Sequence, residues 1–211
     1  MVDDNRFARA IAAIDAVNAD DPNQLTVKGV TRAKELAHAE LVSEWVRRLR
    51  PDAGELLLLA ARGHHLRRWQ SPRSSFPDGR AGYLRWRRDL SERQAEELGQ
   101  LLGREGYEAG DVERVRAIVR KRGLGTDADV QALEDALCLT FLETQLADLV
   151  AKTDGPKMVE ILRKTMAKMS PAAIELASSL ELDRDGQRLL AVAATPVATE
   201  SPSRPAPGGR G

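Results

Sequence analysis

The sequence predicts a single all-α domain. Along almost the whole chain of 211 residues, apolar side chains recur at the three- and four-residue spacing of helices, and no segment shows the clear alternation of a strand. The length suits one domain with a continuous core. Residues 195–211 (TPVATESPSRPAPGGRG) lack both periodicity and core-forming side chains. We therefore expect a helical domain over residues 1–194, followed by a disordered tail.

Capping residues and helix-breaking residues determine where the helices of the N-terminal half are expected to begin and end. Asp, Ser and Thr accept hydrogen bonds at helix starts, whereas clusters of proline and glycine end helices. On these criteria a helix starts at Asp3 or Asp4, another runs from Thr31 to about Arg50, a third covers roughly 53–69, and residues 70–82 form a long loop.

The C-terminal half is expected to hold the longest apolar helix, over about 128–152 and opened by Thr126 or Asp127. The other expected helices are a short one from Gly82, one that starts at the capping-box pattern of Ser91 and Gln94, one from Asp111 to the break at GLGT, two over PKMVEILRKTMAKM and PAAIELASSL, and one from about Asp185 to Ala194.

Composition argues against several classes of protein. The 32 basic and 32 acidic side chains cancel, which disfavours a wholesale polyanion binder but leaves room for a local basic patch. The single cysteine, Cys138, rules out an internal disulfide framework and fits a reducing compartment. The N-terminal sequence MVDDNRFARA lacks the order of a signal peptide, and no apolar run approaches the ~20 residues that span a bilayer. We expect a cytoplasmic protein with no membrane partner.

All three histidines interrupt apolar helix faces. His38 lies at helical spacing from apolar residues, and the run LLLLAARGHH ends at His64 and His65. On the longest helix, Glu134 and Asp135 also lie among apolar side chains, where a carboxylate is costly unless it is paired, hydrogen-bonded or metal-bound. Neutral imidazoles and a carboxylate from three helices predict a site for one divalent metal ion (Mn, Fe, Zn, Ni or Co). The alternative is a set of core histidines with satisfied hydrogen bonds, one of them to Asp135.

The order of these residues resembles the HD-domain superfamily of metal-dependent phosphohydrolases. LLLLAARGHHLRRW is similar to its motif of an apolar run ending in His-Asp, and ALEDALCLTFLE is similar to the later helix that supplies the last aspartate. The resemblance covers about residues 31–150. It implies an HD-like helical bundle with His38, His64 and Asp135 in ligand positions. The chain departs from the pattern at His65, which replaces the defining aspartate and would give a set of three histidines and one aspartate.

The chain also resembles a bacterial and fungal family known only as a domain of unknown function. The similarity extends from RFARAIAAIDAVNADDPN through HLRRWQSPRSSFPDGRAGYLRWRRDL to LRKTMAKMSPA. Some members of that family carry a glutamyl-tRNA synthetase label. Neither of the nucleotide-binding signatures expected of such a class I enzyme occurs in this sequence. The resemblance therefore implies no activity.

Seven arginines and four aromatic residues fall between residues 67 and 88. Arginine's planar fork suits phosphate oxygens, and an aromatic face can stack on a base or on an arginine. The segment starts directly after the paired histidines, so it could cover the metal site. The candidate phosphate-binding residues are Arg68, Arg73, Arg80, Arg85 and Tyr83. The alternative is a solvated helix face with aromatic anchors that hold a long loop in place.

These features lead to three hypotheses of function. The first is a divalent-metal phosphohydrolase acting on a nucleotide or another small phosphate ester, in which Glu134 orients or deprotonates water. The second is a non-catalytic module that binds a nucleotide or RNA, although no RNA-binding motif is present. The third is the oxygenase chemistry of some HD-like proteins, which usually employs two irons and more histidines than the three found in this chain.

Overall fold

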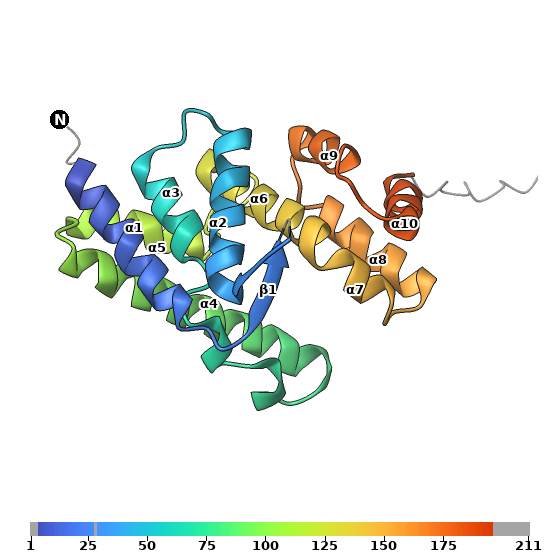
Figure 1. Ribbon diagram of the computed structural model, residues 1–211, viewed down its shortest axis with the longest axis horizontal. Coiled ribbons are helices and arrows are strands. Elements are labelled where there is room, and N and C mark those ends of the chain that lie inside the picture. The colour runs from blue at the N-terminus through green and yellow to red at the C-terminus, as the bar shows by residue number, and fades with distance from the viewer. Residues whose placement is uncertain (1–3, 28, 196–211) are drawn as a thin grey trace, which may run out of the picture.

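The computed structural model describes residues 4–27 and 29–195 (Figure 1). The helices are α1 (Asp4–Ala19), α2 (Lys34–Leu49), α3 (Glu55–Gly63), α4 (Gly79–Arg104), α5 (Ala109–Val119), α6 (Ala128–Thr144), α7 (Leu146–Val150), α8 (Gly155–Met166), α9 (Pro171–Ser178) and α10 (Arg184–Ala194), with short 3₁₀ turns η1 (Arg68–Gln70) and η2 (Arg73–Ser75) and a two-stranded hairpin of β1 (Gln24–Val27) and β2 (Val30–Ala33). The all-α prediction is confirmed. Nearly all of the expected C-terminal tail, from residue 196 onward, lies outside the described residues.

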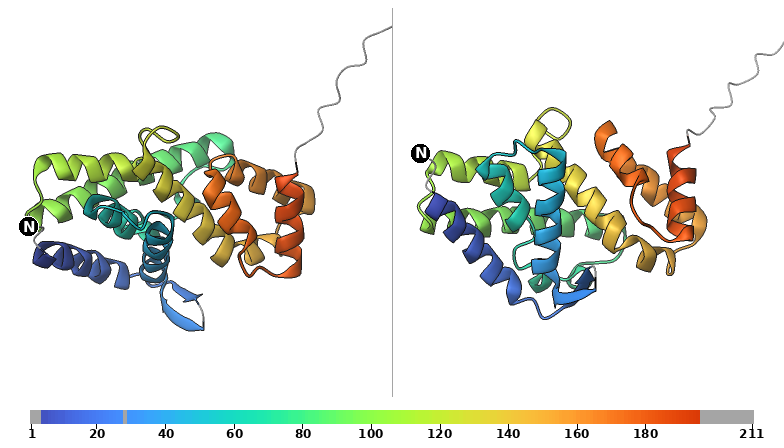
Figure 2. Two further views of the ribbon diagram at one scale, coloured as in Figure 1. Left: turned by 90° about the horizontal axis from the view of Figure 1, so that it is seen from above. Right: turned by 45° about the horizontal axis from the view of Figure 1, so that its top comes forward.

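Helix α6 links two groups of helices (Figures 1 and 2). Helices α1 to α5 form one group, with α2 packed along α6, and α7 to α10 form the other, with the start of α9 packed against α6. The most extensive helix contacts join α2 to α6, α4 to α5, and α8 to α10. In the described part of the chain, no helix is both long and apolar enough to cross a membrane.

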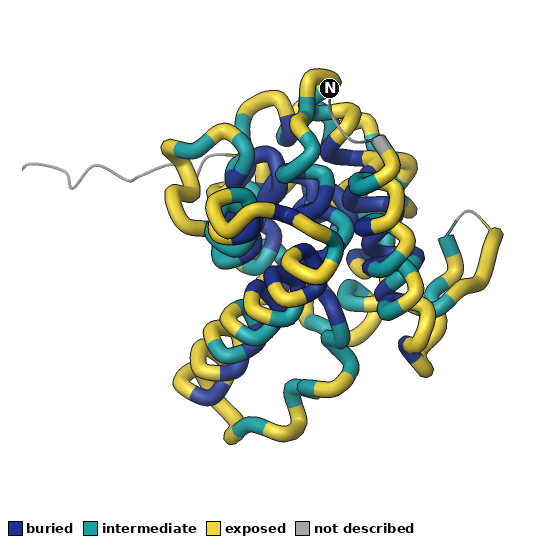
Figure 3. Tube along the Cα trace, turned by 90° about the vertical axis from the view of Figure 1, so that its left-hand side faces the viewer, coloured by how far each residue is buried: buried dark blue, intermediate teal, exposed yellow. Residues whose placement is uncertain are grey.

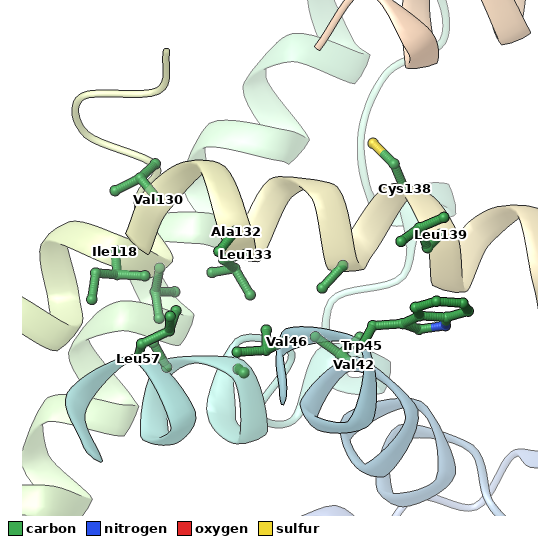
Figure 4. Packing of buried hydrophobic residues seen from close by; sticks show 14 of the residues in the cluster. Val42, Trp45, Val46, Leu57, Ile118, Val130, Ala132, Leu133, Cys138 and Leu139 are labelled. Atoms are coloured by element: carbon green, nitrogen blue, oxygen red, sulfur yellow. The ribbon is translucent and has the colours of Figure 1, made fainter. Parts of the chain in front are cut away.

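The main core lies between α2, α3, α5 and α6 (Figure 4). Val42 and Val46 of α2 and Leu57 of α3 face α6, and like Leu133 of α6 they are fully or almost fully buried. Burial of each such side chain contributes about 1.5–3 kcal/mol. A Leu133→Ala substitution would lose this contribution and leave a cavity, at a cost of about 2–5 kcal/mol. Two sides of α6 are used, because Cys138 points away from α2 (Figure 4).

The hairpin was not expected from the sequence. Its antiparallel strands pair Val27 with Val30 across a turn in which Gly29 adopts a φ of +79°, and the hydroxyls of Thr26 and Thr31 lie 2.8 Å apart. Strands of four residues are too short to show a clear alternation. The hairpin projects from the helices and is mostly exposed (Figure 3). Thr31 therefore lies in β2, and the prediction that it caps α2 was wrong.

Helix α3 ends at Gly63, earlier than the expected end near residue 69. Gly63 packs so closely on α4 that a Cβ there would lie 2.5 Å from Cδ1 of Leu98. The chain then turns sharply, and Arg67 adopts a left-handed φ of +49°. His64 and His65 follow directly after the last helical residue, so they lie at the C-terminal end of α3 rather than along its face.

Two other helix boundaries differ from those expected. Helix α4 begins at Gly79 and runs without a break through Ser91, so the proposed helix start at that residue was wrong. The long apolar helix expected over 128–152 is divided at Gln145, which separates α6 from α7. Asp127 does cap α6, because its carboxylate accepts hydrogen bonds from the backbone N–H groups of Asp129 and Val130.

Candidate metal centre

Three histidines from two segments of the chain meet in one cluster. His38 lies on the second turn of α2, and His64 and His65 follow α3. The ring centroids are 4.0–5.3 Å apart, and one nitrogen from each ring lies within 4.8 Å of the other two. Among the described residues, these three form the group of histidine, cysteine and acidic side chains close enough to share a metal ion.

Hydrogen bonds fix the tautomers of His64 and His65. Nδ1 of His64 lies 2.8 Å from the carbonyl oxygen of Ala61, which can only accept, so this nitrogen carries the proton. Nε2 of His65 accepts from the guanidinium of Arg68 at 3.4 Å, so His65 also carries its proton on Nδ1. Both rings thus keep an unprotonated Nε2, the form that binds metals.

Two nitrogens in the cluster are buried without a partner in the described structure, Nδ1 of His38 and Nε2 of His64. A buried polar atom without a partner loses about 1–3 kcal/mol of solvation. The pKa of His38 is lowered to about 4, chiefly by burial, with Arg68 adding to the effect against the opposing charge of Glu35. Burial also lowers the pKa values of His64 and His65 well below the usual range. The cluster is therefore three neutral imidazoles at neutral pH.

Asp135 is not part of this cluster. Its buried carboxylate accepts hydrogen bonds from the backbone N–H of Ser170, at 2.8 Å, and from the side chain of Gln131, at 2.9 Å. Ser170 is the N-cap of α9, so Asp135 fastens α9 to α6. The structure thus brings together three of the four predicted ligands and gives the fourth a structural role.

Glu35 is the carboxylate that contacts the cluster. Its Oε2 lies 3.1 Å from Nδ1 of His65, and it lies three residues before His38 on the same side of α2. Its backbone N–H donates to Oδ2 of Asp21, which holds the start of the helix. Burial raises the pKa of Glu35, against the lowering effect of nearby positive charges. The spacing of Glu35 and His38 was the signal in the sequence that could have identified this residue.

The histidines form one wall of a cavity of about 550 Å³ bounded by α4, α6, α7, α8 and the end of α5. Of the predicted phosphate-binding residues, Arg68 and Tyr83 line it. Arg73, Arg80 and Arg85 do not: Arg73 donates to the carbonyls of Phe76 and Pro77, Arg85 pairs with Asp89, and Arg80 is exposed outside the cavity. The cations that also line the cavity are Arg87, Arg88, Arg120, Lys121 and Lys168.

Two of these cations matter most for an anionic ligand. Neither Arg87 nor Arg68 forms an ion pair with a described carboxylate, and the guanidinium of Arg68 lies over the ring of Trp86. The Trp86 indole in turn donates to the carbonyl of Ser71 and holds the loop before α4. The expected aromatic anchor is therefore present, and it also positions Arg68.

Glu134 lines the same cavity and forms salt bridges with Lys121 and, at 3.6 Å, with Lys168. Burial alone would raise the pKa of Glu134, but the two lysines outweigh this effect and the pKa is lowered. The carboxylate is therefore ionised at neutral pH. Sequence reasoning identified Glu134 but not its lysine partners, because Lys121 lies 13 residues before it and Lys168 lies 34 residues after it.

Among the comparisons with known proteins, one family model matches the chain. The family model described as Domain of unknown function (DUF4202) matches residues 8–190. Neither a curated protein nor a solved structure matches the chain. The match spans all the residues of the histidine cluster and of the cavity.

Proposed function

The chain belongs to the DUF4202 family, and we propose that it is a divalent-metal-dependent phosphohydrolase that acts on a small phosphate ester, nucleotides included. One observation carries this proposal: three neutral histidines form one wall of a cavity that is rich in cations, and two of them have buried nitrogens with no partner in the part of the chain that the structure describes. A metal site beside phosphate-binding side chains is the arrangement that metal-assisted phosphoryl hydrolysis requires.

The residues present fit a metal ion. Among the described residues, Nδ1 of His38 and Nε2 of His64 have no hydrogen-bond partner, and Nε2 of His65 has only the long contact with Arg68. Buried nitrogens of this kind are satisfied when they bind an ion. A set of imidazoles favours Zn²⁺, Fe²⁺, Co²⁺ or Ni²⁺ over Mn²⁺, which prefers oxygen ligands. A bound ion would supply a Lewis acid that activates water and neutralises charge on the phosphoryl group.

The chain's own residues would bind the substrate and move the proton. Arg68 and Arg87 would hold phosphate oxygens, because both line the cavity and neither forms an ion pair with a carboxylate of the described residues. Glu134 would accept the proton of the attacking water, since it is ionised and lines the cavity. Tyr83 would border the bound ester from α4.

A relationship to HD-domain phosphohydrolases belongs to this proposal as a hypothesis. His38 and His64 occupy two ligand positions that the resemblance implies, and both are in the cluster. Asp135 lies outside it, and Glu35 contacts it from α2 instead. The ligand set we propose is therefore the three histidines, with Glu35 behind His65.

The test is hydrolysis after reconstitution with single metals. Protein stripped with a chelator would be supplied separately with Zn²⁺, Fe²⁺, Co²⁺, Ni²⁺ and Mn²⁺ and assayed with p-nitrophenyl phosphate and nucleoside monophosphates. We expect metal-dependent turnover that Arg87→Gln reduces at least tenfold. Arg80→Gln is the matched control, because Arg80 lies on the same helix but outside the cavity. Binding of these esters without turnover under any metal would contradict the phosphohydrolase and support the hypothesis of a non-catalytic binding module.

A further inference from the structure

The cavity has two chemically different walls. Arg68, Arg87 and Lys121 make the end that holds the neutral histidines cationic. At the other end, α6, α7 and α8 contribute four apolar side chains, Leu137, Phe141, Leu149 and Ile161. A ligand that fills the cavity therefore meets charge at one end and hydrocarbon at the other.

The change from charged to apolar lining occurs along a single face of α6. Glu134, Leu137 and Phe141 follow one another at spacings of three and four residues, so all three lie on the same side of the helix. Glu134 belongs to the charged end through its bridge to Lys121. Phe141 lies seven residues further on, about 10 Å along the axis. This distance is long enough to separate a phosphate group from the body of a small ester.

The four apolar side chains at the second end of the cavity, here called the apolar wall, are incompletely covered by the protein. Leu137, Phe141, Leu149 and Ile161 pack against the core on one side, yet each is only partly buried. Few polar groups accompany them. Gln145 and Thr165 line this end, and the Thr165 hydroxyl already donates to the carbonyl of Ile161, at 3.0 Å. A sugar or a nucleobase would lose hydrogen bonds to water here and find few replacements.

We infer that the preferred substrate is a phosphate monoester of an apolar alcohol, aromatic or aliphatic, whose hydrocarbon part lies against Leu137, Phe141, Leu149 and Ile161. This inference rests on the proposed function and narrows its substrate class. Burial of hydrocarbon against these side chains releases water from both surfaces. The cavity is of a size that holds small organic molecules, which occupy pockets of about 300–1,000 Å³.

The experiment compares binding of two monoesters of equal charge. Metal-free protein, which would not turn over its ligand, is titrated calorimetrically with 1-naphthyl phosphate and with glycerol 2-phosphate. We expect 1-naphthyl phosphate to bind at least tenfold more tightly, equivalent to about 1.4 kcal/mol at 25 °C. Inorganic phosphate should bind about as weakly as glycerol 2-phosphate, because it engages only the cationic end.

Variants assign the preference to the apolar wall. Leu149→Gln and Ile161→Ser should each reduce the ratio of the two affinities at least threefold and leave the affinity for glycerol 2-phosphate unchanged. Arg87→Gln should weaken both esters alike. Val192→Ser on α10 is the matched control, because Val192 is an exposed apolar residue, at 46 % exposure, outside the cavity. Two variants at different helices protect the test from a single folding defect.

The outcomes separate this inference from the proposed function. Equal affinity for the two esters, or a preference that both variants leave intact, overturns the apolar substrate class even if the reconstituted protein hydrolyses phosphate esters. Tight binding of 1-naphthyl phosphate without hydrolysis under any metal would keep the apolar wall as a binding site and overturn the phosphohydrolase.

Discussion

The carboxylate of Glu35 accepts a hydrogen bond from Nδ1 of His65 at 3.1 Å, across the interface between α2 and the turn after α3. The proton on Nδ1 leaves Nε2 of His65 unprotonated, and the contact fixes the orientation of the ring. Glu35 itself is held by Asp21, whose carboxylate accepts the backbone N–H of Glu35. The loop before the hairpin thus helps to determine the geometry of a cluster formed by two other segments.

Glu35→Ala should weaken metal binding about 10–100-fold, because carboxylates behind metal-binding histidines have effects of this size. Glu35→Gln should lose less, because its amide oxygen can still accept from His65. Competition with a chromophoric chelator gives the affinities. Glu40→Gln, on the same helix but paired with Arg32 at the surface, is the control. An affinity unchanged in Glu35→Ala would remove Glu35 from the site.

Lys121→Met should destabilise the protein by about 3 kcal/mol, the lower end of the cost of breaking a buried ion pair. Glu134 is 4 % exposed, so it would be left buried with only Lys168, at 3.6 Å. Lys164→Met removes an exposed pair with Glu160 and should cost less than about 1 kcal/mol. Urea denaturation measures both. Similar losses in the two variants would mean that Lys121 contributes no more than a surface charge.

Asp127→Ala should lower the free energy of unfolding by about 1–2 kcal/mol, because it removes the cap of α6. Asp127→Asn should lower it less, because asparagine also caps helices. The hydrogen bonds from Arg114, together with those from the backbone, lower the pKa of Asp127 to about 2. Because the pKa is lower in the folded protein, the ionised carboxylate stabilises the fold at pH values above its unfolded-state pKa, which is about 4. This stabilisation is lost as the pH falls through the folded-state pKa of about 2. Wild type and Asp127→Asn should therefore converge in stability between pH 4 and pH 2. A constant difference across that range, measured by denaturation at each pH, would contradict this account.

Cys138 should resist alkylation in the native protein although it lines the cavity. Burial, assisted by the negative charge of Glu134, raises the pKa of its thiol to about 12. The thiolate fraction at pH 8 is then lower than that of a free cysteine by about three orders of magnitude. Iodoacetamide followed by mass spectrometry should modify Cys138 only after denaturation. Rapid modification of the folded protein would show that the thiol is accessible and ionised.

The sequence allowed the all-α class and the meeting of His38 and His64 to be predicted, because periodicity places a residue on a buried face. The same argument predicted, wrongly, that Asp135 joins them. Periodicity does not say which neighbour covers that face. Asp135 is on a buried side of α6, yet α9 lies against it there. Glu35 meets His65 only because α2 packs beside the turn after α3, and no local pattern encodes that packing.

The arginine-rich segment shows the same limit. Its composition indicated phosphate binding, and two of its five predicted residues, Arg68 and Tyr83, line the cavity. Arg73 instead holds the loop through backbone carbonyls. Arg87 lines the cavity from the same side of α4 as Tyr83, which lies four residues before it.

The metal content of the purified protein tests the central claim most directly. Elemental analysis should find about one equivalent of a divalent metal in the wild type. His38→Ala and His64→Ala should lose it, and His65→Ala should retain less. His65→Asp should bind metal with a preference shifted toward harder ions such as Mn²⁺, because an oxygen replaces a nitrogen ligand. Asp135→Asn should keep its metal, because Asp135 lies outside the cluster. A wild type that binds no metal after exposure to each candidate ion, or equal metal content in the wild type and all three alanine variants, would contradict the account.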